Sequence, residues 1–192
     1  MLYLVRHGET VWNAAGRYQG AKDSRLTPKG RAQASATGRL VRSLVAEDIP
    51  LPAAVSPLGR AQETATLIAQ EVPILVCTEP RISEVSIGSW DGLTDFEIEA
   101  EYPGSLSGAT PYDWFFRSPD GEPLDAVVAR VSAWLAGANG PLLIISHGLT
   151  GRIIRGLYLG LSAREMLALP VPHDGVFVLA QGAVEFLAAP SR

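Results

Sequence analysis

The chain has 192 residues, of which 47% are hydrophobic and 19% are charged. This length and composition argue against two full domains and exclude disorder as the main state, because such a chain buries about 70% of its unfolded surface. The net charge of −4 offers no basic footprint for nucleic acid. A single cysteine, Cys77, excludes an intrachain disulfide and a cysteine-based zinc site.

The expected cellular location of the protein rests on two signals that the sequence lacks, a signal peptide and a membrane-spanning segment. The N-terminus has no basic start followed by a long apolar stretch, so no signal peptide is expected. The longest apolar run in the C-terminal half, 141–145, is far shorter than the ~20 residues that a membrane span needs. One cysteine fits a reducing compartment. We therefore expect a soluble cytoplasmic protein with no membrane partner.

Short apolar runs alternate with helical patterns along the chain. In chain order the sequence predicts a strand at 2–5, a helix at 28–45, a strand at 53–56, a helix at 58–71, strands at 74–76 and 141–146, a helix at 148–159, and a closing hairpin of strands at 176–179 and 184–187. Thr27 is the expected N-cap of the first helix, with Pro28 as its first residue. This alternation predicts a three-layer α/β/α sandwich with a mostly parallel central sheet.

The stretch 82–129 differs in composition from the rest of the chain. It holds ten acidic residues against one basic residue, Arg117, and half of the aromatic residues. These aromatics are Trp90, Phe96, Tyr102, Tyr112, Trp114, Phe115 and Phe116. Because glycine and proline interrupt the stretch, we expect short helices and loops that form an acidic, aromatic cap at about 86–125, inserted into one domain spanning 1–192.

Polar motifs follow three of the predicted strands. Arg6-His7-Gly8 follows the first strand, the run from Ser56 to Arg60 follows the second, and Ser146-His147-Gly148 follows the fourth. Ligands of open α/β sheets bind at the carboxyl ends of the strands, so these motifs are expected to meet at one edge. A lone histidine at a strand end is more often structural, but two in matching positions beside arginines favour function.

These residue types suit a phosphomonoester, which carries close to two negative charges. Arg6 and Arg60 can hold its oxygens in bidentate contacts, and helix N-termini can add N–H donors. A neutral histidine can accept the phosphoryl group, while a second, protonated histidine acts as a clamp. Glu84 is the best candidate for the acid that protonates the leaving oxygen. The alternative is that Glu84 is an ordinary solvated glutamate.

An ordered set of motifs carries a family resemblance. The set consists of LVRHGET at 4–10, WN at 12–13, GRYQG at 16–20, Asp23, LTPKG at 26–30, SPLGRAQETA at 56–65, EVSIGSWDG at 84–92 and SHG at 146–148. In this order the motifs resemble the histidine phosphatase superfamily, also called phosphoglycerate mutase-like proteins. The resemblance therefore covers most of the chain and implies the phosphoglycerate mutase-like fold.

The resemblance also implies a role for each matching residue. His7 would be the nucleophile that becomes phosphohistidine, and Glu84 would protonate the leaving oxygen. The residues that would hold the phosphoryl group are Arg6, Arg60 and His147, with further contacts from Asn13 and the Gly148 backbone. Gln19 and Gly20 match a loop that lies against the substrate. Family members of this type use no metal, so neither a metal nor another cofactor is expected.

The expected function is a metal-independent phosphomonoesterase that acts on a small organic phosphate. A cofactor-dependent phosphoglycerate mutase is the alternative, but such mutases carry a longer insertion with several basic residues. A phosphate-binding module without turnover is the other alternative, and it would not need the proton donor at Glu84. The aromatic cap suggests an apolar or ring-like substrate group. A homodimer is the default assembly.

Several other residues receive structural readings. For His173, a turn histidine bonded to Asp174 is favoured over a residue that borders the pocket. For Glu9, an ion-paired, orienting carboxylate beside two arginines is favoured over a second acid. Cys77 is expected in the core, as is Trp134, which lies in a helical pattern with Val127, Val131 and Leu135. Arg152 and Arg155 are expected at a helix surface or at the substrate periphery. Pro123 departs from the family, where a serine is common, and proline offers no side-chain hydrogen bond.

Overall fold

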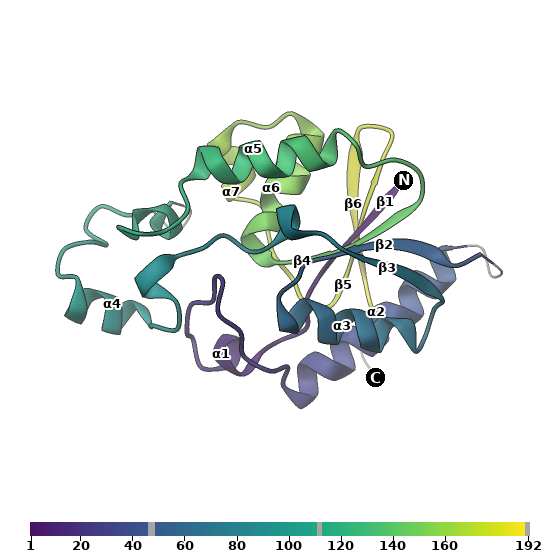
Figure 1. The fold of residues 1–192 in the computed structure, drawn as a ribbon, viewed down its shortest axis with the longest axis horizontal. Coiled ribbons are helices and arrows are strands. Elements are labelled where there is room, and N and C mark those ends of the chain that lie inside the picture. Colours follow the sequence, from purple (N-terminus) through teal and green to yellow (C-terminus); the bar gives the residue numbers. More distant parts are fainter. Residues whose placement is uncertain (46–48, 111–112, 191–192) are drawn as a thin grey trace.

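A six-stranded mixed sheet forms the centre of the molecule (Figure 1). A computed structural model describes residues 1–45, 49–110 and 113–190. The strands are β1 (Leu2–Arg6), β2 (Leu51–Val55), β3 (Ile74–Thr78), β4 (Leu142–Ser146), β5 (Gly175–Ala180) and β6 (Ala183–Ala188), in the order β3-β2-β4-β1-β5-β6. The first four strands in this order pair in parallel, and β5 and β6 are antiparallel. The predicted mostly parallel sheet and closing hairpin are confirmed.

Helices cover both faces of the sheet. They are α1 (Val11–Ala14), α2 (Pro28–Leu44), α3 (Gly59–Ala69), α4 (Asp95–Glu101), α5 (Leu124–Leu135), α6 (Gly148–Leu159) and α7 (Ala163–Leu167). Alternate residues of β1 point to opposite faces: Tyr3 and Val5 pack toward α2 and α3, while Leu2 and Leu4 pack toward α5 and α6. The predicted three-layer sandwich is therefore confirmed, with the two helical layers above and below the sheet in Figure 1.

The local sequence explains where the main elements begin. Thr27 caps α2, because its Oγ1 accepts a hydrogen bond from the Gly30 N–H at 2.9 Å. β2 begins two residues before its predicted start, despite Pro52. Proline is tolerated there because β4 pairs with β2 only from Ala53 onward.

The cap has a small hydrophobic core of its own. Ile87, Trp90 and Ile98 are buried together, and the side chain of Trp114 packs against them. The helix α4 begins in a capping box at Thr94, and two 3-10 turns lie on either side of it in the chain. Short helices and loops were expected in this region, and the described part of the cap contains them. Tyr112 lies outside the described residues, and the assignment of the whole chain to one domain stays a prediction.

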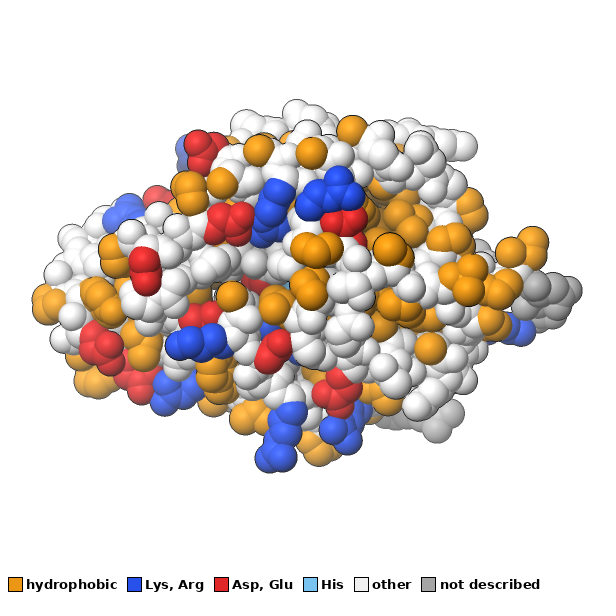
Figure 2. Space-filling model, viewed as in Figure 1, with side chains coloured by type: hydrophobic (Ala, Val, Ile, Leu, Met, Phe, Trp, Pro, Cys, Tyr) orange, Lys and Arg blue, Asp and Glu red, His pale blue; other side chains and the backbone are white. Residues whose placement is uncertain are grey.

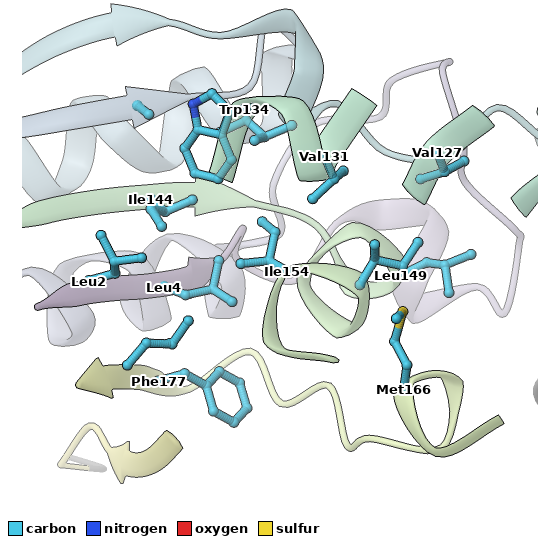
Figure 3. Packing of buried hydrophobic residues seen from close by; sticks show 14 of the residues in the cluster. Leu2, Leu4, Val127, Val131, Trp134, Ile144, Leu149, Ile154, Met166 and Phe177 are labelled. Atoms are coloured by element: carbon cyan, nitrogen blue, oxygen red, sulfur yellow. The ribbon is translucent and has the colours of Figure 1, made fainter. Parts of the chain in front are cut away.

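The main core lies between the sheet and the α5–α6 layer. Figure 3 shows Ile144 of β4 in the middle of this cluster, with Trp134, as predicted, inside it. We expect Ile144→Ala to lower the free energy of unfolding by about 2–5 kcal/mol, because it leaves a cavity in a packed layer. The control is Leu75→Ala on the edge strand β3, where the side chain is 61% exposed and the loss should stay within about 0.5 kcal/mol. Urea unfolding measures both, and equal losses would contradict the assignment of the core.

The expected burial of Cys77 is wrong, since its side chain is exposed on β3. The reason is topological: β3 is an edge strand, and most of its side chains are uncovered. Among the described residues, no helix has the length and apolar character required to span a bilayer.

Candidate active site

The sheet brings the three predicted motifs to one edge. The His7 N–H donates to the Ser146 carbonyl at 3.0 Å, and the Ser56 N–H donates to the Ile145 carbonyl at 3.0 Å. These bonds extend the β1–β4 and β2–β4 pairings by one residue, so the polar residues after the three strands are neighbours. The rings of His7 and His147 lie with their centroids 5.2 Å apart.

His7 is held in one tautomer. Its Nδ1 lies 2.8 Å from the Gly8 carbonyl oxygen, and because a carbonyl only accepts, Nδ1 must carry the proton. The lone pair is then on Nε2. Burial, followed by the charges of His147, Arg6 and Arg60, lowers the pKa of His7 well below its ordinary value. The ring is therefore neutral at neutral pH, which a nucleophilic nitrogen requires.

His147 is fixed by a hydroxyl group. Its Nε2 lies 2.7 Å from Ser56 Oγ. The same oxygen accepts a hydrogen bond from the Leu58 N–H at 3.3 Å. Among the described residues, its buried Nδ1 has no hydrogen-bond partner. Burial and the charges of Arg60 and Arg6 lower the pKa of His147 well below its ordinary value. The predicted protonated clamp thus requires an anion nearby, whose charge favours the protonated ring.

Arg6 is half-buried beside the start of α6. Burial lowers its pKa to about 10, so it keeps its positive charge at neutral pH, and the nearby Glu84 charge opposes that lowering. Its Nη1 donates to the Val171 carbonyl at 2.5 Å, whereas its buried Nε has no partner within the described part of the chain. A Cβ on Gly148 would lie 3.4 Å from this Nε, so the absent side chain leaves the guanidinium room against the helix.

Arg60 organises a loop as well as facing the histidines. Its Nη1 donates to Asp23 Oδ1 at 2.8 Å and to the Lys22 carbonyl at 2.9 Å, and its Nη2 donates to the Gly20 carbonyl at 2.8 Å. The side chain is fully buried, and its Nε has no partner among the described residues. Sequence reasoning assigned Arg60 to phosphate alone and gave Asp23 no role, although Asp23 stood within the motifs.

Gly20 lies where no side chain fits. Its N–H donates to Asp91 Oδ1 at 2.8 Å, and a Cβ would lie 2.7 Å from the Val85 carbonyl oxygen. Asp91 also accepts from the Lys22 N–H at 2.7 Å. Asp91 therefore joins the loop at 20–22 to the cap. The sequence placed Asp91 in a motif but predicted no role for it.

Glu84 binds the N-terminus of α6. Its Oε2 accepts from the Leu149 N–H at 3.1 Å, and its Oε1 accepts from the Thr150 N–H and Oγ1, each at 3.0 Å. Two of the N–H groups at the start of α6, which were expected to bind phosphate, therefore bind Glu84 instead. The Gly148 N–H does not bind Glu84. The carboxyl group is half-buried between the sheet edge and the cap.

Asn13 and Gln19 are both tied to Thr10. The Thr10 N–H donates to Asn13 Oδ1 at 3.1 Å in the capping box of α1, and Thr10 Oγ1 donates to Gln19 Oε1 at 2.8 Å. Gln19 also reaches a recess beside Glu84. This recess is lined by Tyr18, Gln19, Glu84, Val85, Ile87, Trp114, Phe115 and Leu149.

Three structural readings from the sequence are corrected here. The Nδ1 of His173 does not bind Asp174, because it donates a hydrogen bond to the His7 carbonyl at 2.7 Å. Arg155 is buried, with its guanidinium carbon 3.9 Å from the centre of the Phe177 ring. Glu9 is ion-paired as expected, but its partner is Lys29 at 2.8 Å and not an arginine.

Charges of both signs are mixed on the surface. On the face shown in Figure 2, basic and acidic side chains are interspersed, without an extended patch of one sign. No group of three or more His, Cys, Asp or Glu side chains within the described ranges is placed to hold a metal ion. Arg6 and Arg60 supply positive charge to both histidines, and Arg130 adds to it at His147.

The mixed sheet with paired histidines at its edge has the architecture of an α/β enzyme of phosphoryl chemistry. The model of the histidine phosphatase superfamily (branch 1) matches residues 2–186, and the chain belongs to this superfamily.

Relatives and solved structures agree with this assignment. "Probable phosphoglycerate mutase GpmB" of Erwinia tasmaniensis is 35% identical over 167 residues, which covers 84% of this chain and 76% of the relative. The alpha-ribazole phosphatase of Shigella flexneri superposes with a TM-score of 0.79 at 26% identity, covering 99% and 96% of the two chains. A mycobacterial glucosyl-3-phosphoglycerate phosphatase in complex with VO3 gives 0.76 at 26% identity, covering 97% and 96%.

The histidines predict how stability depends on pH. Burial first, and then the Arg6 charge, lowers the pKa of His173 to about 4, and the pKa values of the other two histidines are also lowered. The unfolded chain takes up these protons near pH 6.5, so between about pH 6.5 and 4 it binds more protons than the folded chain. We expect the free energy of unfolding to fall as pH drops through this window. Urea midpoints at about pH 7.5 and 5.5 test this, and equal midpoints would contradict it.

Proposed function

We propose that the protein is a phosphomonoesterase that works through a phosphohistidine at His7 and without a metal ion. The observation that carries this proposal is the hydrogen bond from His7 Nδ1 to the Gly8 carbonyl, which leaves the lone pair on Nε2 of a neutral ring. The arginines beside it supply the positive charge that a phosphoryl group needs. Membership of a superfamily whose solved members include phosphatases supports the same reaction.

The reaction proceeds in two steps. The lone pair of His7 Nε2 attacks phosphorus, the P–O bond to the alcohol breaks, and the leaving oxygen takes a proton from Glu84. Water then attacks the phosphorus of phosphohistidine and gives a proton to the Glu84 carboxylate. The P–N bond breaks, its electron pair returns to His7, and phosphate leaves. The same carboxyl group thus serves as acid and then as base.

Fixed cations and dipoles hold the phosphoryl group. Arg6 has a buried Nε without a partner among the described residues, and so has Arg60, while His147 offers its Nδ1. If Ser56 donates its hydroxyl proton to His147 Nε2, the proton of the neutral ring lies on Nδ1 and can bond a phosphate oxygen. Because these groups are fixed before substrate arrives, little reorganisation accompanies the chemical step.

The recess beside Glu84 favours an alcohol with an apolar or ring-like part. The ring centroids of Trp114 and Tyr18 are 3.9 Å apart, and those of Trp114 and Phe115 are 3.7 Å apart. These rings, whose planes are inclined by 39° and 30°, offer apolar contact area next to the group that protonates the leaving oxygen. The many carboxylates of the cap disfavour a highly anionic substrate.

Hydrolysis is favoured over phosphoglycerate isomerisation, although the relatives at 35–38% identity are named as mutases. A mutase must also grip the carboxylate of its substrate. In the cap, Arg117 donates to the carbonyls of Ser107 and Gly108 at 2.7 and 2.9 Å, and it lies 3.3 Å from Asp113. This guanidinium is therefore occupied within the cap.

The test is phosphate release from a panel of phosphomonoesters in the presence of a chelator. The panel contains aryl, alkyl and phosphoglycerate esters, and it includes an ester of a ring-bearing alcohol. Release that persists in chelator, with the ring-bearing ester as the best substrate, is the expected result. Isomerisation of 3-phosphoglycerate without phosphate release would support the mutase. Stabilisation by phosphate with no turnover on any ester would support a binding module.

The partners follow from the proposed reaction. A small phosphomonoester is the proposed ligand, with no role for nucleic acid or a membrane, and the cytoplasm is the proposed location. A homodimer stays the proposed assembly. Light scattering during size-exclusion chromatography measures the assembly directly.

A further inference from the structure

Three arginines hold one short segment that enters the site. Three consecutive carbonyls each accept a hydrogen bond: Leu169 from Arg152 Nε at 2.6 Å, Pro170 from Arg155 Nη2 at 2.6 Å, and Val171 from Arg6 Nη1 at 2.5 Å. Two of these arginines lie on α6, and the third is the last residue of β1 in the sheet. The segment 169–171 is therefore fixed against both the helix and the sheet.

This segment places His173 next to the backbone carbonyl of His7. The Nδ1 of His173 donates to the His7 carbonyl at 2.7 Å, and its ring meets the His7 ring edge-on at 5.6 Å. Since a carbonyl only accepts, Nδ1 carries the proton. His173 thus uses its N–H on the backbone of the residue that bears the predicted nucleophile.

The peptide unit between His7 and Gly8 is held at both ends. Its carbonyl accepts from His173, and its N–H, which belongs to Gly8, donates to Thr64 Oγ1 at 3.1 Å. The next carbonyl along the chain, that of Gly8, is the one that binds His7 Nδ1. The orientation of the 7–8 peptide unit therefore sets the position of the group that fixes the His7 ring.

We propose that His173 is a positioning residue for the reaction: by binding the His7 carbonyl, it aims His7 Nε2 at phosphorus. The proposal rests on the proposed function, in which His7 is the nucleophile. His173 takes no part in bond making, and its effect passes through the 7–8 peptide unit. Misplacing a reacting atom by about 1 Å can cost about 10²-fold in rate, so a hydrogen bond of this kind can matter kinetically.

A matched pair of variants separates this role from packing. His173→Asn keeps an N–H donor near the place of Nδ1, whereas His173→Leu keeps a side chain of moderate size without a donor. We expect His173→Leu to lower kcat and the rate of phosphohistidine formation by about 10–100-fold, with KM changed less than about threefold. His173→Asn should recover most of that loss. Rapid-quench measurement of phosphohistidine and steady-state phosphate release give these quantities.

Thr64→Val provides a second measurement if His173→Leu fails to fold. It removes the other hydrogen bond of the same peptide unit, and we expect the same pattern, a fall in kcat without a matching rise in KM. A Thr64→Val enzyme with the wild-type kcat would count against the proposal.

The outcomes distinguish this proposal from the proposed function. A wild-type enzyme that forms phosphohistidine, with a His173→Leu variant that keeps the wild-type kcat, overturns the positioning role alone. The same holds if His173→Asn loses as much as His173→Leu, because the donor would then be irrelevant. A wild-type enzyme that releases phosphate without any phosphohistidine overturns the proposed function, and this proposal with it.

Discussion

His7→Ala is expected to abolish phosphohistidine and to lower phosphate release by at least about 10³-fold, because the variant has no nitrogen to accept the phosphoryl group. His7 is buried, and its neutral ring presents Nε2 with a lone pair, which alanine cannot supply. The measurement is labelling with a phosphoryl-labelled substrate, followed by acid and alkali treatment, since the P–N bond is labile in acid.

The matched control is Cys77→Ser. Cys77 is exposed on the edge strand β3, away from the predicted site, so this variant should keep the wild-type labelling and turnover. Retention of the label in His7→Ala would assign the nucleophile to another residue. Wild-type turnover in His7→Ala without any label would point instead to direct attack by water.

Glu84→Gln is expected to harm substrates with poor leaving groups much more than substrates with good ones. Gln has the same shape, and its one carbonyl oxygen can still accept the N–H bond from Thr150, but its NH2 group cannot accept the bond from the Leu149 N–H. The amide also has no acidic proton to give to the leaving oxygen. For an alkyl phosphate we expect kcat/KM to fall by about 10²–10⁴-fold. For nitrophenyl phosphate the fall should be about tenfold or less, because nitrophenolate leaves without a proton.

The choice of kcat/KM matters for this test. Glu84 is also proposed to activate water in the second step, so kcat can fall for both substrates, whereas kcat/KM reports the steps through formation of phosphohistidine. Glu9→Gln is the control, because Glu9 binds Lys29 and has no proposed role in proton transfer. Equal losses in kcat/KM on both substrates would remove Glu84 from the role of acid.

The sheet and its motif-bearing edge could be predicted because the relevant signals are local. Short apolar runs followed by polar motifs gave the strands ahead of His7, Arg60 and His147, and parallel pairing then placed these residues together. Strand ends shifted by one or two residues, as at Leu51, because pairing with a neighbour decides where a strand begins.

The contacts that sequence reasoning missed join distant positions or depend on which strand lies at an edge. His173 binds a backbone carbonyl 166 residues away, and no side-chain pattern signals a carbonyl partner. Arg155 lies in the core because its hydrogen bonds go to carbonyls and its guanidinium group lies over the Phe177 ring. The usual rule that arginines without an acidic partner are exposed therefore gave the wrong prediction for this residue. Cys77 looked buried because its strand is apolar, although that strand is an edge.

The position of β1 in the sheet has a consequence for the order of folding. β1 precedes the other five strands in the chain but lies between β4 and β5 in the sheet, where Leu2 pairs with Leu142 on one side and with Leu179 on the other. When residue 148 has been synthesised, the nascent chain holds all the motifs of the predicted site, but β1 still lacks β5, its second neighbour in the sheet. Because such distant pairing slows folding, β1 stays an apolar strand with one unpaired edge, and so prone to aggregate, until β5 has been synthesised.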